Sequence, residues 1–474
     1  MKRPLIIAAT FIFASACSEP LQEPADISTE TSQVEPATTI ELSPEELCLV
    51  KQIANKTPKI RPETAQETAI QLLDLQSQSS SLTKKMSATV FCNKKQVYNS
   101  LTKTYKQEYD TAFYVFNTPD DKGFAIVAAD VRVPNQVLAY SDNGNFDPDS
   151  DNPATELFIE LAKDYVAEHI ATAEAQEDSL TNSIYQKLGI KNENNNPNSL
   201  AKAKELMRIK CTTMGLPEIT TINKGEVQPL LTTHWSQEAP YNNECQDRPV
   251  GCAPIAIAQI LNYWQKPSRL YGFTINWNDI SKNNEENNDF RAAVAQFIFT
   301  IRTEIYTKEN GGTPPENEIA FFYNYNFTNQ TQFNKYQFNQ VADALEHGRP
   351  VFMGALSNEG GHAWVADGSV IREVITKQTF RYCIVEQEDD GTITDRYEDI
   401  TTTTYTLHEL LHFNWGWGGD ADGYFNKGLF DTRKPLEENH YGEFMQMNDQ
   451  NVRHKYLFNR RIETITDIYP RTNL

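Results

Sequence analysis

Three residue types that together can carry out acyl transfer occur in order along the chain: a cysteine, a histidine and an asparagine. Cys252 lies near the start of GCAPIAIAQILNYWQKP, His362 near the start of GGHAWVADG, and Asn414 within LLHFNWGWGGDADGYF. A thiolate is a nucleophile, an imidazole can take up and return its proton, and an amide carbonyl can hold the imidazole ring in one orientation. The residue types and their order predict a thiol nucleophile activated by a histidine.

Cys252 is expected at the start of a buried helix, because the residues after it are apolar on nearly every side. Pro254 suits the first helical turn, and Pro267 lies beyond the helix end. At a helix N-terminus the unpaired N–H groups and the helix dipole favour the thiolate, so we expect the pKa of Cys252 to lie below the free-thiol value of about 8.5. A buried, inert cysteine is the alternative for this feature taken alone.

His362 is expected at the start of a strand. The flexible pair of glycines before it allows the imidazole to be presented at a cleft. Strand alternation sets two groups of residues on opposite faces, His362, Trp364 and Ala366 on one and Ala363, Val365 and Asp367 on the other. A packed or exposed histidine is the alternative here.

Two further residues complete the predicted site. Gln237, in HWSQEAPYN, lies 15 positions before Cys252 (252 minus 237) and can offer its amide to an oxyanion, together with the Cys252 N–H. Trp415 or Trp417, which follow Asn414, can keep water away from the contact between Asn414 and His362. Each motif is ambiguous alone, but four of them in this order favour catalysis.

A competing motif, H-E-x-x-H, is spelled by His408, Glu409 and His412. On a helix it would form a zinc site, because residues four apart lie about 6 Å from each other, whereas in a strand the two histidines would be about 13 Å apart. The β-branched run TTTTYT precedes the motif and glycines follow it, which favours a strand. We therefore expect no zinc site, with His408 at the surface and His412 on a strand near the site.

The four motifs together resemble those of the streptopain family of bacterial cysteine peptidases. The resemblance covers residues from about 229 to 432 and extends to YVFNTPDDKGFAIVAADVRVPNQVLAYSDNGNFD, which looks like the prodomain of that family. It implies that Cys252 is the nucleophile, His362 the general base and acid, Asn414 its orienter with Trp415 shielding the contact, and Gln237 an oxyanion donor.

The resemblance also implies a fold and an activity. The fold class is α+β, a papain-like cysteine peptidase domain with a helical half carrying Cys252 and an antiparallel β half carrying His362 and Asn414, preceded by a small α+β prodomain. The expected protein is a secreted zymogen with endopeptidase activity, which acts on proteins or peptides, is inhibited by its own prodomain and needs no cofactor beyond a reduced thiol. The family has Tyr-His where this chain has Tyr263-Trp264, and residues 368–411 form an insertion that can reshape the cleft.

The N-terminus has the three parts of a secretory signal: Lys2 and Arg3, an apolar run, and small residues before Cys17. Cys17 after small residues resembles the lipobox of bacterial lipoproteins, so membrane contact is expected only through a lipid anchor at Cys17, with the protein in the cell envelope or secreted after processing. Ordinary signal cleavage that leaves Cys17 as a free thiol is the alternative.

Changes in composition and the positions of turn-forming residues divide the 474 residues into five regions. These are a signal peptide (1–16), a lipidated, disordered tether (17–46), an inhibitory prodomain (47–175), a linker with the processing site (176–226) and a cysteine peptidase domain (227–474). Within the prodomain, PETAQETAIQLLDLQ predicts a helix, Asp-Asp-Lys-Gly a hairpin turn, and Glu156 to His169 a second helix.

Charge and cysteine content limit the partners and leave some questions open. The net charge of -21 opposes binding to nucleic acid, since no basic cluster offsets it. The six cysteines after Cys17 allow fifteen full pairings, and none is favoured. Three rivals to the peptidase also stay open: a non-catalytic binding or inhibitory surface protein, the zinc peptidase, and a thiol acyltransferase.

Overall fold

A computed structural model describes residues 38–74, 87–99, 104–189, 210–246, 248–328, 332–357, 361–387, 393–431 and 458–471. The expected signal segment, Cys17 and residues 190–209 of the expected linker lie outside these residues. Within the described ranges, no helix combines the length and the apolar composition needed to span a membrane.

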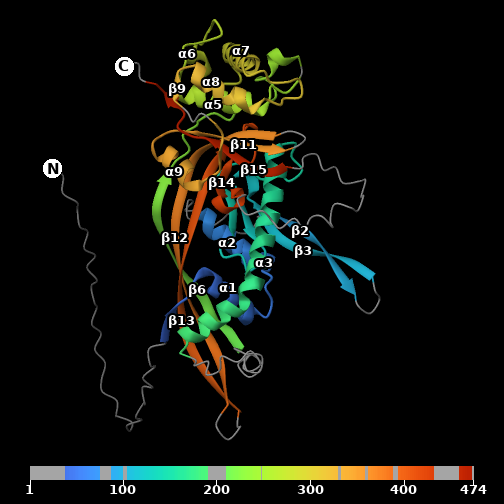
Figure 1. Ribbon diagram of the computed structural model, residues 1–474, viewed down its shortest axis with the longest axis vertical. Coiled ribbons are helices and arrows are strands. Elements are labelled where there is room, and N and C mark those ends of the chain that lie inside the picture. Colours follow the sequence, from blue (N-terminus) through green and yellow to red (C-terminus); the bar gives the residue numbers. More distant parts are fainter. Residues whose placement is uncertain are drawn as a thin grey trace, which may run out of the picture. The chain divides into compact units, whose positions relative to one another are not determined.

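Most described strands belong to one sheet (Figure 1). Its order is β10 (Asn334–Lys335), β15 (Phe458–Ile465), β11 (Val351–Ser357), β12 (Gly361–Gln387), β13 (Ile393–Asn414), β14 (Gly423–Asn426), β5 (Val137–Ser141), β4 (Phe124–Ala128), β3 (Thr104–Asn117) and β2 (Ser87–Asn99). Two more strands join it, β6 (Lys210–Val227) beside β12 and β1 (Thr38–Glu41) parallel to β13. Four short strands form separate pairs, β7 (Arg269–Leu270) with β8 (Phe273–Thr274) and β9 (Phe327–Thr328) with β16 (Tyr469–Pro470).

The helices divide between the N-terminal region and the C-terminal region. The first has α1 (Pro44–Asn55), α2 (Pro62–Asp74) and α3 (Pro153–Lys187); the second has α5 (Cys252–Trp264), α6 (Trp277–Ile280), α7 (Asn288–Glu304), α8 (Pro315–Asn324) and α9 (Phe338–Glu346). The described C-terminal region thus has a mainly helical half, from α5 to α8, and an antiparallel β half. This confirms the α+β fold class expected from the sequence.

The local predictions in the N-terminal region are confirmed where the structure describes them. The helix predicted from PETAQETAIQLLDLQ is α2, and β3 and β4 form the hairpin around Asp-Asp-Lys-Gly. The second predicted helix is longer than expected, because Asn152 caps α3 by accepting from Ala154 N and the helix continues to Lys187. The expected prodomain boundary at residue 175 therefore falls inside α3.

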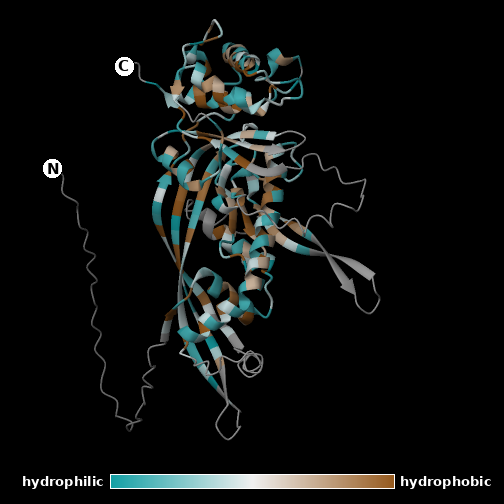
Figure 2. Cartoon of the chain, viewed as in Figure 1, coloured by the Kyte–Doolittle hydropathy of each residue, from teal (hydrophilic) through white to brown (hydrophobic). Residues whose placement is uncertain are grey.

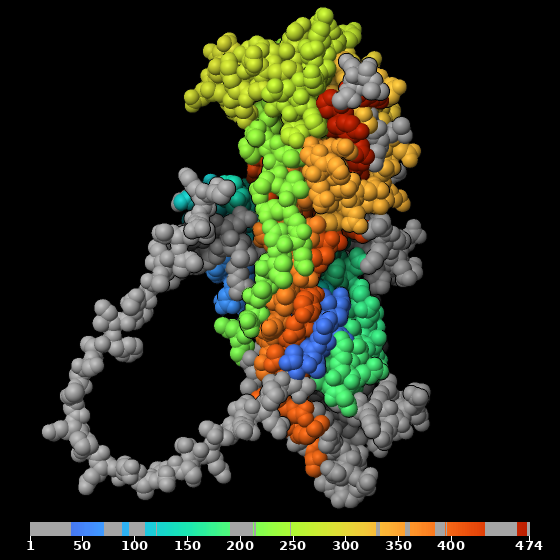
Figure 3. Space-filling model, turned by 90° about the vertical axis from the view of Figure 1, so that its left-hand side faces the viewer, coloured from blue at the N-terminus to red at the C-terminus, as the bar shows by residue number. Residues whose placement is uncertain are grey.

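The segment expected as a linker contributes a long strand. β6 pairs with β12 from Lys210 to Val227, and Figure 3 shows its green surface running beside the orange strands. Its Ile and Thr residues suit an extended chain, and β12 offers it an open edge. The turn-forming residues Pro217, Asn223 and Gly225 had suggested a loop, but pairing with a neighbouring strand outweighs that local preference.

The insertion at residues 368–411 forms most of β12 and β13. Their outer parts, residues 372–387 and 393–408, are termed the ribbon. The ribbon packs against α1 and the end of α3 through a closed apolar cluster, termed the clamp. The clamp comprises Leu42, Leu47, Leu49, Val50, Ile184, Phe380, Tyr382 and Ile400.

A second contact, termed the seam, joins the two regions where β14 pairs with β5. The rings of Tyr140 and Tyr424 stack there with centroids 5.1 Å apart. Phe158 of α3 meets Phe425 edge to face, in a core shared by both regions. Figure 2 shows hydrophobic positions gathered where α3 lies along the strands.

The two faces of the sheet bury different residues of β12. Trp364 and Ala366 belong to the core shared with α3, whereas Ala363 and Val365 belong to the core of the helical half. The alternation predicted for GGHAWVADG is confirmed for these four residues. The consequence for the site is that the strand after His362 touches both cores.

Candidate active site

Cys252 is the first residue of α5, whose next nine residues are all buried. Gly251 precedes it with a φ of 100°, and a Cβ there would lie 2.9 Å from a main-chain oxygen of a neighbouring loop, so only glycine fits. Arg302 donates from Nη1 to the Val250 carbonyl at 2.6 Å. The buried guanidinium thereby fixes the segment that leads into the helix.

The Cys252 thiol accepts a hydrogen bond from the backbone N–H of Ala363, the residue after His362. Burial raises the pKa of this thiol to about 11, and hydrogen bonds from Ala363 and from the N-terminus of α5 only partly offset that effect. The expectation of a lowered pKa is therefore wrong for the intact chain. Desolvation of the sulfur outweighs the effect of the helix N-terminus, although Cys252 as a residue is only partly buried.

His362 lies at the start of β12 and is 2% exposed. Its Nε2 lies 3.2 Å from the main-chain oxygen of Trp415. Because a carbonyl oxygen can only accept, Nε2 carries the proton and Nδ1 keeps a lone pair. Burial lowers the pKa of His362 to about 4, so the imidazole is neutral at pH 7 and is ready to accept a proton at Nδ1.

Asn414 lies near the site, but its amide contacts other partners than the imidazole. Its Oδ1 accepts from Gln259 Nε2 at 2.9 Å and from Gly416 N at 3.1 Å. Its Nδ2 donates to the carbonyl of Thr233 at 2.7 Å, and Thr233 Oγ1 donates to Gln259 Oε1 at 2.7 Å. The result is a closed buried network that ties the end of β13 to the nucleophile helix.

Two hydrogen bonds hold Trp415 in place, one from its main chain and one from its side chain. Its N–H donates to Asp422 Oδ1 at 2.8 Å, and its indole Nε1 donates to the carbonyl of Ala421 at 3.1 Å. The next residue, Gly416, has a φ of 69°, and a Cβ there would lie 3.0 Å from the Ile255 side chain on α5. The carbonyl that accepts from His362 is thus fixed relative to the helix that carries Cys252.

Gln237 lies beside the segment that precedes the nucleophile, since its carbonyl accepts from Val250 N at 3.1 Å. The residue is 7% exposed. Its side-chain amide has no hydrogen bond to any residue that the structure describes. The amide is therefore available to a bound group.

The H-E-x-x-H motif lies on strand β13, as expected. His408 is opposite Arg372 and His412 opposite Gly368 on β12. His408 is half-buried rather than at the surface. His412 Nδ1 lies 2.6 Å from Asp367 Oδ1. Over the described ranges no cluster of three or more metal-binding side chains occurs.

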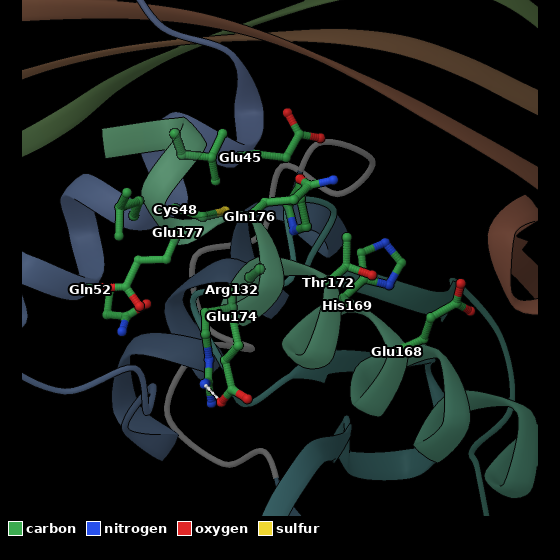
Figure 4. Close-up of a pocket in the computed structure, with 14 residues that line it drawn as sticks. Glu45, Cys48, Gln52, Arg132, Glu168, His169, Thr172, Glu174, Gln176 and Glu177 are labelled. Atoms are coloured by element: carbon green, nitrogen blue, oxygen red, sulfur yellow. Dashed lines mark hydrogen bonds and ion pairs between the residues drawn. The ribbon is translucent and has the colours of Figure 1, made fainter. Parts of the chain in front are cut away.

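The pocket drawn in Figure 4 lies between α1 and α3, away from Cys252. Arg132 reaches across it and pairs with Glu174 at 2.7 Å. Cys48 lines the same pocket, and burial raises the pKa of its thiol to about 12. This pocket belongs to the N-terminal region and takes no part in the candidate site.

The cysteines that the structure describes in side-chain detail are all free. They are Cys48, Cys92, Cys245, Cys252 and Cys383. Cys252 is the one that contacts the segment bearing His362.

Two site residues were not singled out from the sequence. Gln259 is the one amide in the otherwise apolar stretch IAIAQIL of α5, and a buried amide requires partners, so its position was a usable signal. Asp422, in GGDADG, gave no such signal, because glycine-rich loops often carry solvated aspartates.

Several known proteins and two protein families are similar to this chain. The chain matches the Peptidase C10 family over residues 235–303 and 273–425, and the Spi protease inhibitor family over residues 57–166. It is 23% identical to streptopain of Streptococcus pyogenes over 356 residues, 66% of this chain and 73% of that protein. It is 21% identical over 363 residues to the thiol protease/hemagglutinin PrtT of Porphyromonas gingivalis, 68% of this chain and 34% of that protein.

A solved fragment of prointerpain A from Prevotella intermedia is also similar, with 19% identity and a TM-score of 0.43, covering 81% of this chain and all of that one. The two family matches lie on either side of the expected linker, the inhibitor family on the N-terminal region and the peptidase family on the region that contains Cys252 and His362. The chain is a cysteine peptidase of the streptopain-like Peptidase C10 family, and it carries a Spi-type inhibitory prodomain ahead of its catalytic region.

Proposed function

We propose that this peptidase is an endopeptidase made as a zymogen, with Cys252 as nucleophile and His362 as general base and acid. The observation that carries the proposal is the chain of contacts at the site. The thiol accepts from Ala363 N, the adjacent His362 is bound through Nε2, and its Nδ1 keeps the lone pair.

In the proposed reaction the Cys252 proton moves to His362 Nδ1, and the sulfur attacks the carbonyl carbon of a peptide bond. The oxyanion accepts from the Gln237 amide and the Cys252 N–H. When the C–N bond breaks, the imidazolium gives its proton to the leaving amine and a thioester remains. His362 then takes a proton from water, the hydroxyl attacks the thioester, and the carboxylic acid and the thiol are released.

Asn414 is proposed as a positioning residue rather than as the direct partner of the imidazole. Its amide bonds to Gln259, Gly416 and Thr233, and the acceptor for Nε2 is the carbonyl of Trp415. The side chain thus acts through the main chain that follows it. The Trp415 ring, 6.2 Å from the imidazole, excludes water from that hydrogen bond.

Inhibition by the prodomain is supported by its contacts with the catalytic loop. Ser150 and Asn152 bond to Asp420, in the loop that joins Trp415 to β14. In the intact chain the thiol and the imidazole are both uncharged near pH 7, because desolvation raises the pKa of the thiol and lowers the pKa of the imidazole. We propose that removal of the prodomain opens the site to solvent and allows the charged pair to form.

The test is to purify residues 18–474 with and without Cys252→Ala and to follow their size under reducing conditions, with a chelator in parallel samples. We expect the wild type to shorten to about half its mass, because the 227–474 region is about half of the chain. The substitution should block this conversion, and the chelator should not. Equal shortening of both proteins, stopped by the chelator, would return the zinc alternative.

We further propose that Cys17 carries a lipid anchor in the cell envelope. The support is the basic, apolar and small-residue order of residues 1–17. In a bacterial host we expect the wild type to partition into the detergent phase of a membrane extract and Cys17→Ser to stay in the aqueous phase. If both partition alike, cleavage without lipidation is the better explanation.

A further inference from the structure

An acidic side chain occupies a core position of the helical half. On α8, Glu318 shares the inward face with Phe321 and Phe322, and it is 7% exposed. Its carboxyl makes no hydrogen bond and no ion pair with any residue that the structure describes. A buried carboxyl without a partner is unfavourable for folding alone, so its presence calls for another explanation.

A second buried carboxyl lies on the sheet beside the nucleophile. Gly354 of β11 is opposite both Ala363 of β12 and Glu463 of β15. Residues in register across a sheet point to the same face, so Glu463 faces the helical half, as Ala363 does. Two strand spacings separate their Cα atoms, which is about 10 Å.

The surface of the sheet between Ala363 and Glu463 carries no side chain, because Gly354 lies there. A Cβ built on Gly354 would meet a single atom within 4 Å, the carbonyl oxygen of His362 at 3.9 Å. The missing side chain leaves space on the sheet next to Ala363, whose N–H bonds to the Cys252 thiol. This position lies between Ala363 and Glu463 across the sheet.

The causes of the pKa shifts also indicate that Glu318 lies near Glu463 and Cys252. Burial raises the pKa of Glu318 well above its usual range, and the negative charges of Glu316 and Glu463 raise it further. No cation contributes to this shift. Glu318 in turn is one of the causes that raise the pKa of Cys252, so it lies near the nucleophile.

We propose that Glu318 and Glu463, with the open floor at Gly354, form an acidic subsite that binds the Lys or Arg side chain of a substrate near the cleaved bond. This proposal rests on the proposed function and adds a substrate class to it. A lysine or arginine suits the space, because its apolar stem can lie along the floor while its charge reaches the carboxylates. It would supply the cation that Glu318 lacks.

The test compares two matched peptide substrates on the activated enzyme, one with lysine and one with norleucine at the same position. A peptide library first identifies that position, which we expect within about four residues of the cleaved bond, given the 10 Å reach. Glu318→Gln should lower kcat/KM for the lysine peptide at least about thirtyfold, since one partner of a buried ion pair is lost. The norleucine peptide should change less than about twofold, because it never uses the charge.

Glu346→Gln is the matched control, since this exposed glutamate on α9 is not among the charges that raise the pKa of Glu318 and should alter neither peptide. A measurement on the wild type alone covers the case in which Glu318→Gln does not fold: the ratio of the two kcat/KM values should rise with pH as Glu318 ionises. Equal use of both peptides, or a preference for norleucine, would overturn the subsite and leave the peptidase intact. If the activated wild type cleaves no library peptide, the proposed function fails, and the subsite fails with it.

Discussion

The seam and the clamp hold the same prodomain in different ways. The seam contacts the loop that carries Trp415, through strand pairing and through Ser150 and Asn152. The clamp lies near Ile400 on β13, which is 14 residues from Asn414 (414 minus 400) and so about 45 Å away along an extended strand. We infer that the clamp holds the prodomain on the chain, whereas the seam controls the state of the site.

The largest test of this comparison removes a clamp side chain. Phe380 is fully buried against the N-terminal region. We expect Phe380→Ala to lower the unfolding free energy of the intact chain by about 3 to 5 kcal/mol, the range for large-to-small changes in cores. In the activated enzyme the same change should have a smaller effect on stability and little effect on kcat/KM, because the partners of Phe380 in the N-terminal region have left.

Denaturant unfolding of both forms measures this difference. Tyr405→Ala is the control, because Tyr405 lies on the same ribbon and is 46% exposed. A large loss of activity in the activated Phe380→Ala enzyme would show that the ribbon also supports the site, and the comparison would then be wrong.

A matched pair of serines gives a sharper test with a smaller effect. Ser150 donates to Asp420 across the seam, whereas Ser183 of α3 donates to Glu46 of α1 beside the clamp and within the N-terminal region, each at 2.6 Å. Each Ser→Ala change leaves a partly or fully buried carboxylate with one donor fewer, which costs about 1 to 3 kcal/mol. We expect only Ser150→Ala to raise the basal activity of the intact chain on a small peptide, by about tenfold for each 1.4 kcal/mol that opens the seam.

Basal hydrolysis is measured before any shortening of the chain, with both variants at the same protein concentration. Unfolding of the two variants shows whether the stability losses are matched. Equal basal activity of Ser150→Ala and Ser183→Ala would remove the distinction between the two contacts.

The smallest expected effect is a difference in pH response. Burial alone would lower the pKa of His412, but Asp367, with Asp422 and Asp142, outweighs it and raises that pKa. His234 also lies in this group, paired with Asp422. A raised pKa stabilises below the unfolded value of about 6.5, and the stabilisation is lost as pH rises through the folded value. The region beside the seam should therefore weaken as pH rises.

The N-terminal region beside the clamp should respond in the opposite direction. Burial alone would raise the pKa of Glu46, but hydrogen bonds from Lys187, Ser183 and Ser43 N outweigh it, and the pKa is lowered. A lowered pKa stabilises above the unfolded value, and the stabilisation is lost as pH falls through the folded value. Unfolding curves of His412→Gln and Glu46→Gln against pH should each lose one of these slopes, at most about 1.4 kcal/mol per pH unit. His347→Gln, at an exposed histidine, should lose neither.

The sequence predicted the elements better than their electrostatics. Local patterns located α2, α5 and the β3–β4 hairpin, because apolar periodicity and turn residues act over short ranges. The thiol pKa was misjudged, because burial by residues distant in sequence outweighs the helix N-terminus. β6 was missed for the same reason, since its partner β12 lies about 150 residues further along the chain.

At the site, residue types predicted the members but not their hydrogen bonds. Cys252, His362 and Gln237 came from motifs, and the structure brings the segments that carry them together. The acceptor for His362 is a main-chain carbonyl, which no side-chain pattern reveals. The roles of all five predicted residues stay predictions.

The pairing of β14 with β5 has a consequence for the solubility of the activated enzyme. Loss of the prodomain would bare the edge of β14, and unpaired strand edges invite association with other chains. β14 has only 4 residues, whereas its neighbour β13 has 22. The newly exposed edge of β14 therefore offers few hydrogen-bonding groups, which limits association through this edge when the enzyme becomes active.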